Sequence, residues 1–163
     1  MAAIIYRHPV AGFRLPLPPD WERVEDARPG VALIAVEPDH GGGFRANVVV
    51  TAERLPPGLD LDAWQDGADG LLRDALADYV LIDRERLDLD GRDVVRRLAH
   101  HAHEDTGPIT MEQWAMVGGG LGYTLTASVA TPEYDAAADA FAGIAWGFRL
   151  AGPAGDGDTP TEP

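Results

Sequence analysis

The chain has 163 residues, 45% hydrophobic and 25% charged, the composition of an ordinary globular protein with a single domain. It contains no cysteine, which excludes disulfides, thiolate nucleophiles and cysteine-ligated zinc or iron–sulfur centres. The net charge is −14, and all 13 basic residues are arginine, so the field of the protein disfavours nucleic acids and anionic membranes as partners.

The first third of the chain carries short strand signals separated by turns. Residues 1–14 lack a basic region followed by an apolar run, so we expect a cytoplasmic protein without membrane insertion. Apolar or alternating segments predict strands at residues 4–6, 13–15, 31–36 and 44–53. Prolines at 16, 18 and 19 and glycines at 41–43 supply turns, and we expect Trp21 to be a core residue.

A helix is predicted after the proline–glycine break at 56–58, with Asp60 or Asp62 as its N-cap. Its apolar positions recur at helical spacing: Leu61, Trp64, Ala68, Leu71, Leu72 and Ala75. The opposite face carries Asp62, Asp66 and Asp69, which we expect to be solvated, while Gly67 and Gly70 would allow close approach to a sheet. We expect this helix to cross over to a strand at 79–89 that is parallel to the preceding strand.

The remainder of the domain reads as antiparallel hairpins and a last helix. Asp90 and Gly91 predict a type I′ turn. The resulting register places Glu85 opposite Arg96, Leu87 opposite Val94, and Arg84 opposite Arg97. Further strands are predicted at 92–103, 109–117 and 121–129, and a helix with Thr131 as N-cap buries Tyr134, Ala138, Phe141 and Ile144. We expect one domain over residues 1–150 and a disordered acidic tail over 151–163.

Two places in these hairpins are candidate binding sites. Like charges directly opposite one another are unfavourable unless something anionic neutralises them, so Arg84 and Arg97 require either an internal carboxylate or a bound anion or acidic partner. Trp114, with Met111 and Met116, would form an adaptable apolar surface if it were exposed. A binding module predicts an exposed apolar patch around Trp114 or beside the final helix, whereas an enzyme predicts a deep pocket of ionisable groups.

Catalytic and metal-binding motifs are weak. His101 and His103 share one face of their strand and His100 points to the other, so a third metal ligand would have to come from Glu104, Asp105, Glu112 or His40. Ser128, the single serine, lies inside a strand, and the glycine runs lack the lysine of a phosphate-binding loop. We therefore predict no catalytic residue, no metal site and no cofactor, with a small metal-dependent or acid–base enzyme using His101 and His103 as the competing hypothesis.

Several segments, over about residues 5–150, resemble the LpqN-type actinobacterial family of the PsbP-like α/β/α sandwich group, which also contains a yeast Ran-binding factor. They are residues 13–21 (FRLPLPPDW), 44–50 (FRANVVV), the turn at 89–92, 112–114 (EQW), 122–126 (GYTLT), and Phe141, Ile144 and Phe148. The resemblance implies an α+β fold, with a twisted, mostly antiparallel β-sheet of about six to eight strands and two main helices.

The resemblance further implies a non-enzymatic binding or adaptor domain that recognises a protein partner, with a secretion- or chaperone-related role as one form. A carrier of an apolar ligand held between helix and sheet is the alternative. The sequence also allows a homodimer that pairs through an uncovered strand edge, at residues 4–6 or 148–150.

Overall fold

The computed structural model describes residues 2–151, so the tail predicted over 151–163 lies almost wholly outside the described residues. A seven-stranded antiparallel sheet has the order β3-β4-β5-β9-β8-β7-β6, and β1 and β2 form a separate two-stranded sheet. The elements are β1 (Ile4–Arg7), β2 (Arg14–Leu17), β3 (Glu22–Arg28), β4 (Val31–Val36), β5 (Asn47–Arg54), α1 (Leu61–Ala75), β6 (Val80–Asp88), β7 (Asp93–His103), β8 (Gly107–Gly118), β9 (Leu121–Ala130), the 3-10 turn η1 (Thr131–Glu133) and α2 (Tyr134–Gly147).

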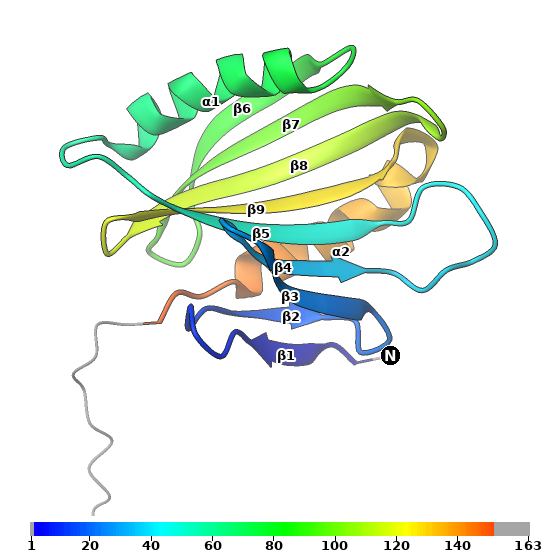
Figure 1. Ribbon diagram of the computed structural model, residues 1–163, viewed down its shortest axis with the longest axis horizontal. Coiled ribbons are helices and arrows are strands. Elements are labelled where there is room, and N and C mark those ends of the chain that lie inside the picture. The colour runs from blue at the N-terminus through cyan, green and yellow to red at the C-terminus, as the bar shows by residue number, and fades with distance from the viewer. Residues whose placement is uncertain (1, 152–163) are drawn as a thin grey trace, which may run out of the picture.

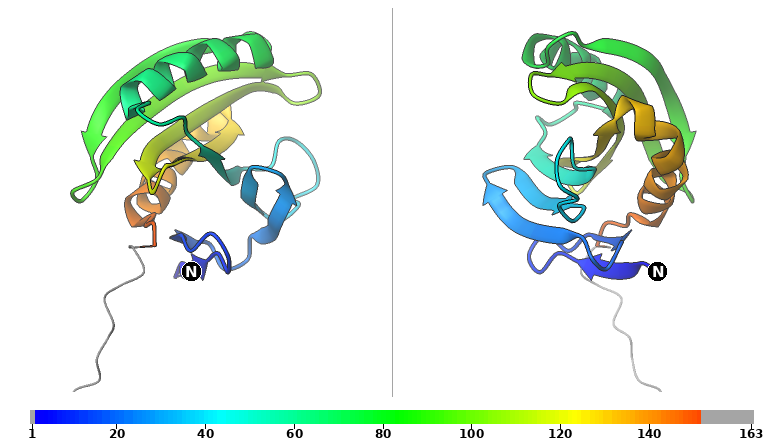
Figure 2. Two further views of the ribbon diagram at one scale, coloured as in Figure 1. Left: turned by 60° about the vertical axis from the view of Figure 1, so that its left-hand side comes forward. Right: turned by 90° about the vertical axis from the view of Figure 1, so that its right-hand side faces the viewer.

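The large sheet is strongly curved and lies between two layers. Helix α1 lies on its outer face, while α2 and the β1–β2 sheet lie against its concave face (Figures 1 and 2). This arrangement confirms the predicted α+β sandwich with a mostly antiparallel sheet and two main helices. Neither helix has the length and apolar character needed to cross a lipid bilayer.

The β6–β7 hairpin forms as its turn residues predict. Asp90 and Gly91 have φ angles of 57° and 80°, as a type I′ turn requires, and Leu89 and Arg92 exchange backbone hydrogen bonds of 2.9 and 3.3 Å. The strand register follows from this turn, and the predicted pairing of Arg84 with Arg97 is confirmed.

Two features of the topology differ from the prediction. Strand β3, at the edge of the large sheet, was not predicted, because its sequence ERVEDAR is exposed throughout and has no apolar alternation. The crossover does link strands that run in the same direction, β5 and β6, as predicted, but the two strands are not neighbours, because β9, β8 and β7 lie between them. Helix α1 carries the chain across the outer face to the far edge of the sheet (Figure 1).

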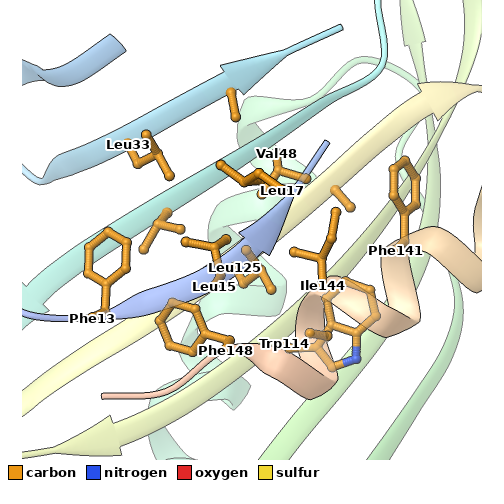
Figure 3. Close-up of a cluster of buried hydrophobic side chains, with 14 of the residues drawn as sticks. Phe13, Leu15, Leu17, Leu33, Val48, Trp114, Leu125, Phe141, Ile144 and Phe148 are labelled. Carbon is orange, nitrogen blue, oxygen red and sulfur yellow. The ribbon is translucent and has the colours of Figure 1, made fainter. Parts of the chain in front are cut away.

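The main core fills the concave face of the sheet (Figure 3). Phe13, which directly precedes β2, stacks on Phe148, with ring centroids 5.5 Å apart, and both rings are fully buried. Trp114 of β8 packs in the same cluster with Phe141 and Ile144 of α2, and each such buried side chain contributes about 1.5–3 kcal/mol to folding. Trp21 is only half-buried at the margin of this cluster, because it lies at the start of the edge strand β3.

A second, smaller apolar cluster joins α1 to the outer face of the sheet. Leu61 of α1 packs with Val95 and Ala115, and Asp60 caps the helix by accepting a 2.8 Å hydrogen bond from the amide of Ala63, as predicted. The Trp64 ring lies directly over Gly122 of β9, where a Cβ atom would come within 2.6 Å of the ring. Gly122 of the strand therefore allows α1 to approach the sheet closely. Gly67 and Gly70 of the helix face open space, contrary to the prediction.

This contact gives a test of the helix–sheet packing. We expect Gly122→Ala to lower the free energy of unfolding by about 1–3 kcal/mol, because the added methyl group displaces the Trp64 ring. We expect the control Gly70→Ala to raise it by about 0.5–1 kcal/mol, since it adds helix propensity without a clash. Urea unfolding followed by circular dichroism measures both changes, and equal effects of the two substitutions would contradict the packing described.

Candidate functional site

The predicted arginine pair is neutralised from within the chain. The Arg84 guanidinium donates to Asp69 Oδ2 at 2.7 Å, and Arg97 Nε donates to the other oxygen of the same carboxylate at 2.7 Å. Arg97 is 1% exposed, and its remaining donors bind the side chain and carbonyl of Gln65 and the side chain of Gln113. An external anion could bind between Arg84 and Arg97 only by displacing the Asp69 carboxylate. Anion binding by this pair therefore stays a prediction.

The acidic face of α1 is therefore not simply solvated, contrary to the prediction. Asp66 also pairs with Arg84, at 2.7 Å, and Asp62 pairs with Arg86. Helical periodicity correctly places the three aspartates on one face, but that face lies over the arginines of β6 and β7. The ion pairs attach the helix to the sheet, with Asp69 largely covered and Asp62 and Asp66 still exposed to solvent.

Trp114, the third predicted binding residue, lies in the core and is 3% exposed. Met111 and Met116 are also buried. The side of β8 that carries Trp114 faces α2, which covers it (Figure 3). The apolar surface expected around Trp114 is thus filled by the protein's own final helix.

The histidines of β7 do not converge on a metal site. His103 stacks edge-on against Phe44 with centroids 6.2 Å apart, and His40 pairs with Glu37 at 3.0 Å. Glu112 projects from the other face of the sheet, where it accepts hydrogen bonds from Arg96 and Tyr134. Within residues 2–151, no three His, Asp or Glu side chains are grouped so that they would hold a metal ion.

A buried histidine that the sequence analysis did not single out connects the small sheet to the large one. His8 is 4% exposed, and its Nδ1 accepts hydrogen bonds from the amides of Val10 and Ala11 at 3.2 and 2.8 Å. This fixes the proton on Nε2, which donates to Asp26 at 3.2 Å, and both residues line a hollow of about 610 Å³. Because both ring nitrogens are engaged, His8 is a structural link to the bulged part of β3 and has no free nitrogen to act as a base.

An apolar groove lies between β2 and α2 and is open to the surface. Its volume is about 400 Å³, and its walls are Ala3, Pro16, Leu17, Pro18, Ala140, Gly143 and Ile144. Exposed apolar residues flank it, since Ile5 lies opposite Pro16 in the small sheet and Trp146 is 54% exposed at the end of α2. This is the exposed apolar patch that a binding module predicts beside the final helix.

The two ends of this groove carry opposite charges. Strand β2 and helix α2 run antiparallel, because Gly147 contacts Pro16 and Arg149 pairs with Arg14. Arginines therefore lie beyond the end formed by Pro16 and Gly147. The exposed acids Asp135 and Asp139 precede the groove residue Ala140 at the other end. A groove with an apolar centre, one basic end and one acidic end can bind a segment in a single orientation, which a uniformly apolar patch cannot specify.

No protein-family model matches the chain, and no curated protein matches it in sequence. Solved structures are similar in fold. The PsbP of Synechocystis sp. PCC 6803 is 18% identical with a TM-score of 0.73, covering 92% of this chain and 93% of that one. LpqN, involved in cell envelope biogenesis of Mycobacterium tuberculosis, is 16% identical with a TM-score of 0.68, covering 92% and 91%. The Saccharomyces cerevisiae Ran-binding protein Mog1p is 11% identical with a TM-score of 0.61, covering 92% and 96%.

At these identities the likeness shows the fold. The chain has a PsbP-like fold with structural neighbours that include LpqN, as the resemblance in sequence implied.

The bridging carboxylate gives a test of the α1 attachment. We expect Asp69→Asn to lower the free energy of unfolding by about 3 kcal/mol, because it leaves the buried Arg97 charge without its partner. The control Asp62→Asn breaks a solvent-exposed pair with Arg86 and should cost less than about 1 kcal/mol. Urea unfolding measures both, and a small effect of Asp69→Asn would show that Arg97 is neutralised in another way.

The pH dependence of stability should carry a contribution from His101, because burial lowers the pKa of its imidazole. The unfolded chain takes up this proton near the ordinary pKa of about 6.5, so stability falls as the pH drops below about 7. We expect His101→Gln to show a shallower loss of stability between about pH 7.5 and about pH 5.5. Urea unfolding at these pH values measures how steeply the free energy of unfolding changes with pH. Identical slopes for the wild-type protein and His101→Gln would show that His101 does not contribute.

Proposed function

We propose that this protein is a non-enzymatic binding or adaptor domain that recognises a segment of a protein partner in the groove between β2 and α2. The observation that carries the proposal is the apolar groove with charges of opposite sign at its ends. A partner segment suited to it has apolar side chains in its centre and a basic residue next to Asp135 and Asp139. The excess of acidic residues in the chain favours the approach of such a basic residue.

The structural neighbours support a binding role in general terms. One of them is named as a Ran-binding protein, and the fold is shared along nearly the whole of both chains. A groove between two packed elements can bind a partner without any catalytic residues, so the proposed role requires no active site. The composition without cysteine suits the cytoplasm, where we propose that the protein acts.

The two competing functions find less support in the geometry. An enzyme centred on His101 and His103 needs further ionisable groups beside them, and Glu112 lies on the other face of the sheet. A carrier needs a cavity between helix and sheet, and the hollow under α1 has a volume of about 170 Å³. Ligand sites for molecules of drug size measure roughly 300–1,000 Å³, so a lipid-like ligand would not fit under α1. The groove between β2 and α2 is large enough at about 400 Å³, but it is open to the surface and does not enclose a ligand.

Two glycines provide a matched test of the groove. Gly143 in α2 lines the groove and Gly70 in α1 lies on the other side of the large sheet, and a side chain at either position meets open space. Gly143→Glu places a charge in the groove, and Gly70→Glu makes the same chemical change elsewhere on the surface. Circular dichroism and unfolding curves should show that both variants fold.

The binding measurement has two stages. Cross-linking in the native host, followed by mass spectrometry, identifies a partner protein, which is then purified and titrated by calorimetry. We expect Gly143→Glu to weaken binding by at least about tenfold and Gly70→Glu to leave it unchanged. Equal affinities of the two variants, or a partner cross-linked only to the outer face near α1, would place the site elsewhere.

A further inference from the structure

Three arginines lie side by side at the basic end of the groove. Arg7 of β1 is directly opposite Arg14 of β2, and Arg14 is in turn paired with Arg149 after α2. The amides of Arg14 and Arg149 donate to each other's carbonyl oxygens at 2.9 and 2.8 Å. We call Arg7, Arg14 and Arg149 the arginine row.

The backbone pairing brings the first two side chains of the arginine row close together. Because the N–H and C=O groups of Arg14 point toward Arg149, Arg7 and Arg14 form a non-hydrogen-bonded antiparallel pair, whose Cα atoms lie about 4.5 Å apart. Their neighbours along the chain, Phe13, Leu15 and Phe148, are fully buried, so by strand alternation the arginine row projects from the face away from the core. Arg7 and Arg14 are both exposed.

The charge of the arginine row is poorly compensated. Arg149 pairs with Asp90 at 2.8 Å, but neither Arg7 nor Arg14 has a carboxylate within 4.0 Å among residues 2–151. Arg92 adds further positive charge nearby. Burial lowers the pKa of the Arg92 guanidinium, and the charge of Arg149 lowers it further. Like charges directly opposite each other on two strands are destabilising, and this pair lies in a chain with 27 acidic residues.

The same molecule shows how such a pair is neutralised. Arg84 and Arg97 are also directly opposite each other, and there one carboxylate, that of Asp69, lies between them and accepts from both guanidiniums at 2.7 Å. At Arg7 and Arg14, no acidic side chain of the described residues occupies the equivalent place.

We propose that Arg7, Arg14 and Arg149 bind a carboxylate side chain from an acidic peptide segment of the partner, in the way that Asp69 binds Arg84 and Arg97. This inference rests on the proposed function and deepens it, because the arginine row lies at the end of the groove opposite Asp135 and Asp139. The partner segment is then acidic at one end, apolar in the centre and basic at the other end, which also fixes its direction in the groove.

Arginine is suited to this role, because its planar fork binds both oxygens of a carboxylate. Two other kinds of anion could bind the same three arginines. Free phosphate matches the same fork, and the chain's own acids at Asp156, Asp158 and Glu162 follow Arg149 closely in sequence. The test therefore separates the three sources.

The experiment is an NMR titration of the full chain at low ionic strength, observing the arginine Nε–Hε signals. The probe is the peptide acetyl-Glu-Glu-Glu-amide, with acetyl-Gln-Gln-Gln-amide as the uncharged control and inorganic phosphate as a second ligand. We expect saturable shifts at Arg7, Arg14 and Arg149 with the glutamate peptide only. Arg14→Gln and Arg7→Gln should each weaken its binding by at least about fivefold. The control Arg73→Gln removes the same charge from α1 and should have no effect.

Four outcomes would overturn the proposal. They are shifts spread over all arginines, equal effects of Arg14→Gln and Arg73→Gln, binding of phosphate without binding of the peptide, and peptide binding that appears only when Asp156, Asp158 and Glu162 are replaced by their amides. The last result would assign the site to the chain's own acids. Gly143→Glu should leave peptide binding intact, so failure of the arginine row and failure of the groove are distinguishable.

Discussion

The position of the Arg97 guanidinium constrains the outer half of this molecule. A cation buried in the middle of a sheet is costly unless it is paired and fully hydrogen-bonded, and Arg97 obtains its partners from α1 through Asp69 and Gln65. These contacts matter because α1 buries few residues, with Leu61 and Gln65 its only fully covered side chains. Polar contacts of fixed geometry thus supplement a small apolar cluster in placing the helix. With α1 held on the outer face, the concave face is left to α2 and the small sheet (Figure 2). The groove lies at the junction of β2 and α2.

The two faces of the sheet are stabilised in different ways. The concave face holds the large aromatic and aliphatic core, in which Phe13, Phe148 and Trp114 take part. Helix α2 is apolar around most of its circumference, and small residues, Ala136, Ala140 and Gly143, remain exposed where the sheet does not cover them. Ala140 and Gly143 line the groove without filling it. Gly147 lets the end of the helix lie close to β2, since a Cβ atom there would come within 2.5 Å of the Pro16 ring. The surface that we propose for binding is therefore the uncovered margin of the core itself.

Sequence reasoning succeeded where local chemistry determines geometry. The Asp90–Gly91 turn fixed the register of the hairpin as far as the bulge beside Asp83, and alternation identified β9. It failed where the outcome depends on distant contacts. Periodicity shows that Asp62, Asp66 and Asp69 share a face, but not that arginines of β6 and β7 meet it. The sequence predicted both strands of the small sheet. It did not predict the pairing of Arg7 with Arg14, because the loop between the two strands lacks a two-residue turn signal. Strand β3 was missed because an exposed edge strand needs no apolar alternation.

The charged edges of the large sheet bear on how copies of this protein can associate. Strand β3 exposes five charged side chains in seven residues, and β6 at the other edge carries a bulge beside Asp83 and a run of further charges. Such rims resist the strand-to-strand addition through which open sheets polymerise. The molecule should then remain dispersed at high concentration, and any stable assembly it enters should be built face to face, through helix and groove, leaving the hydrogen-bonding edges of the seven strands unused.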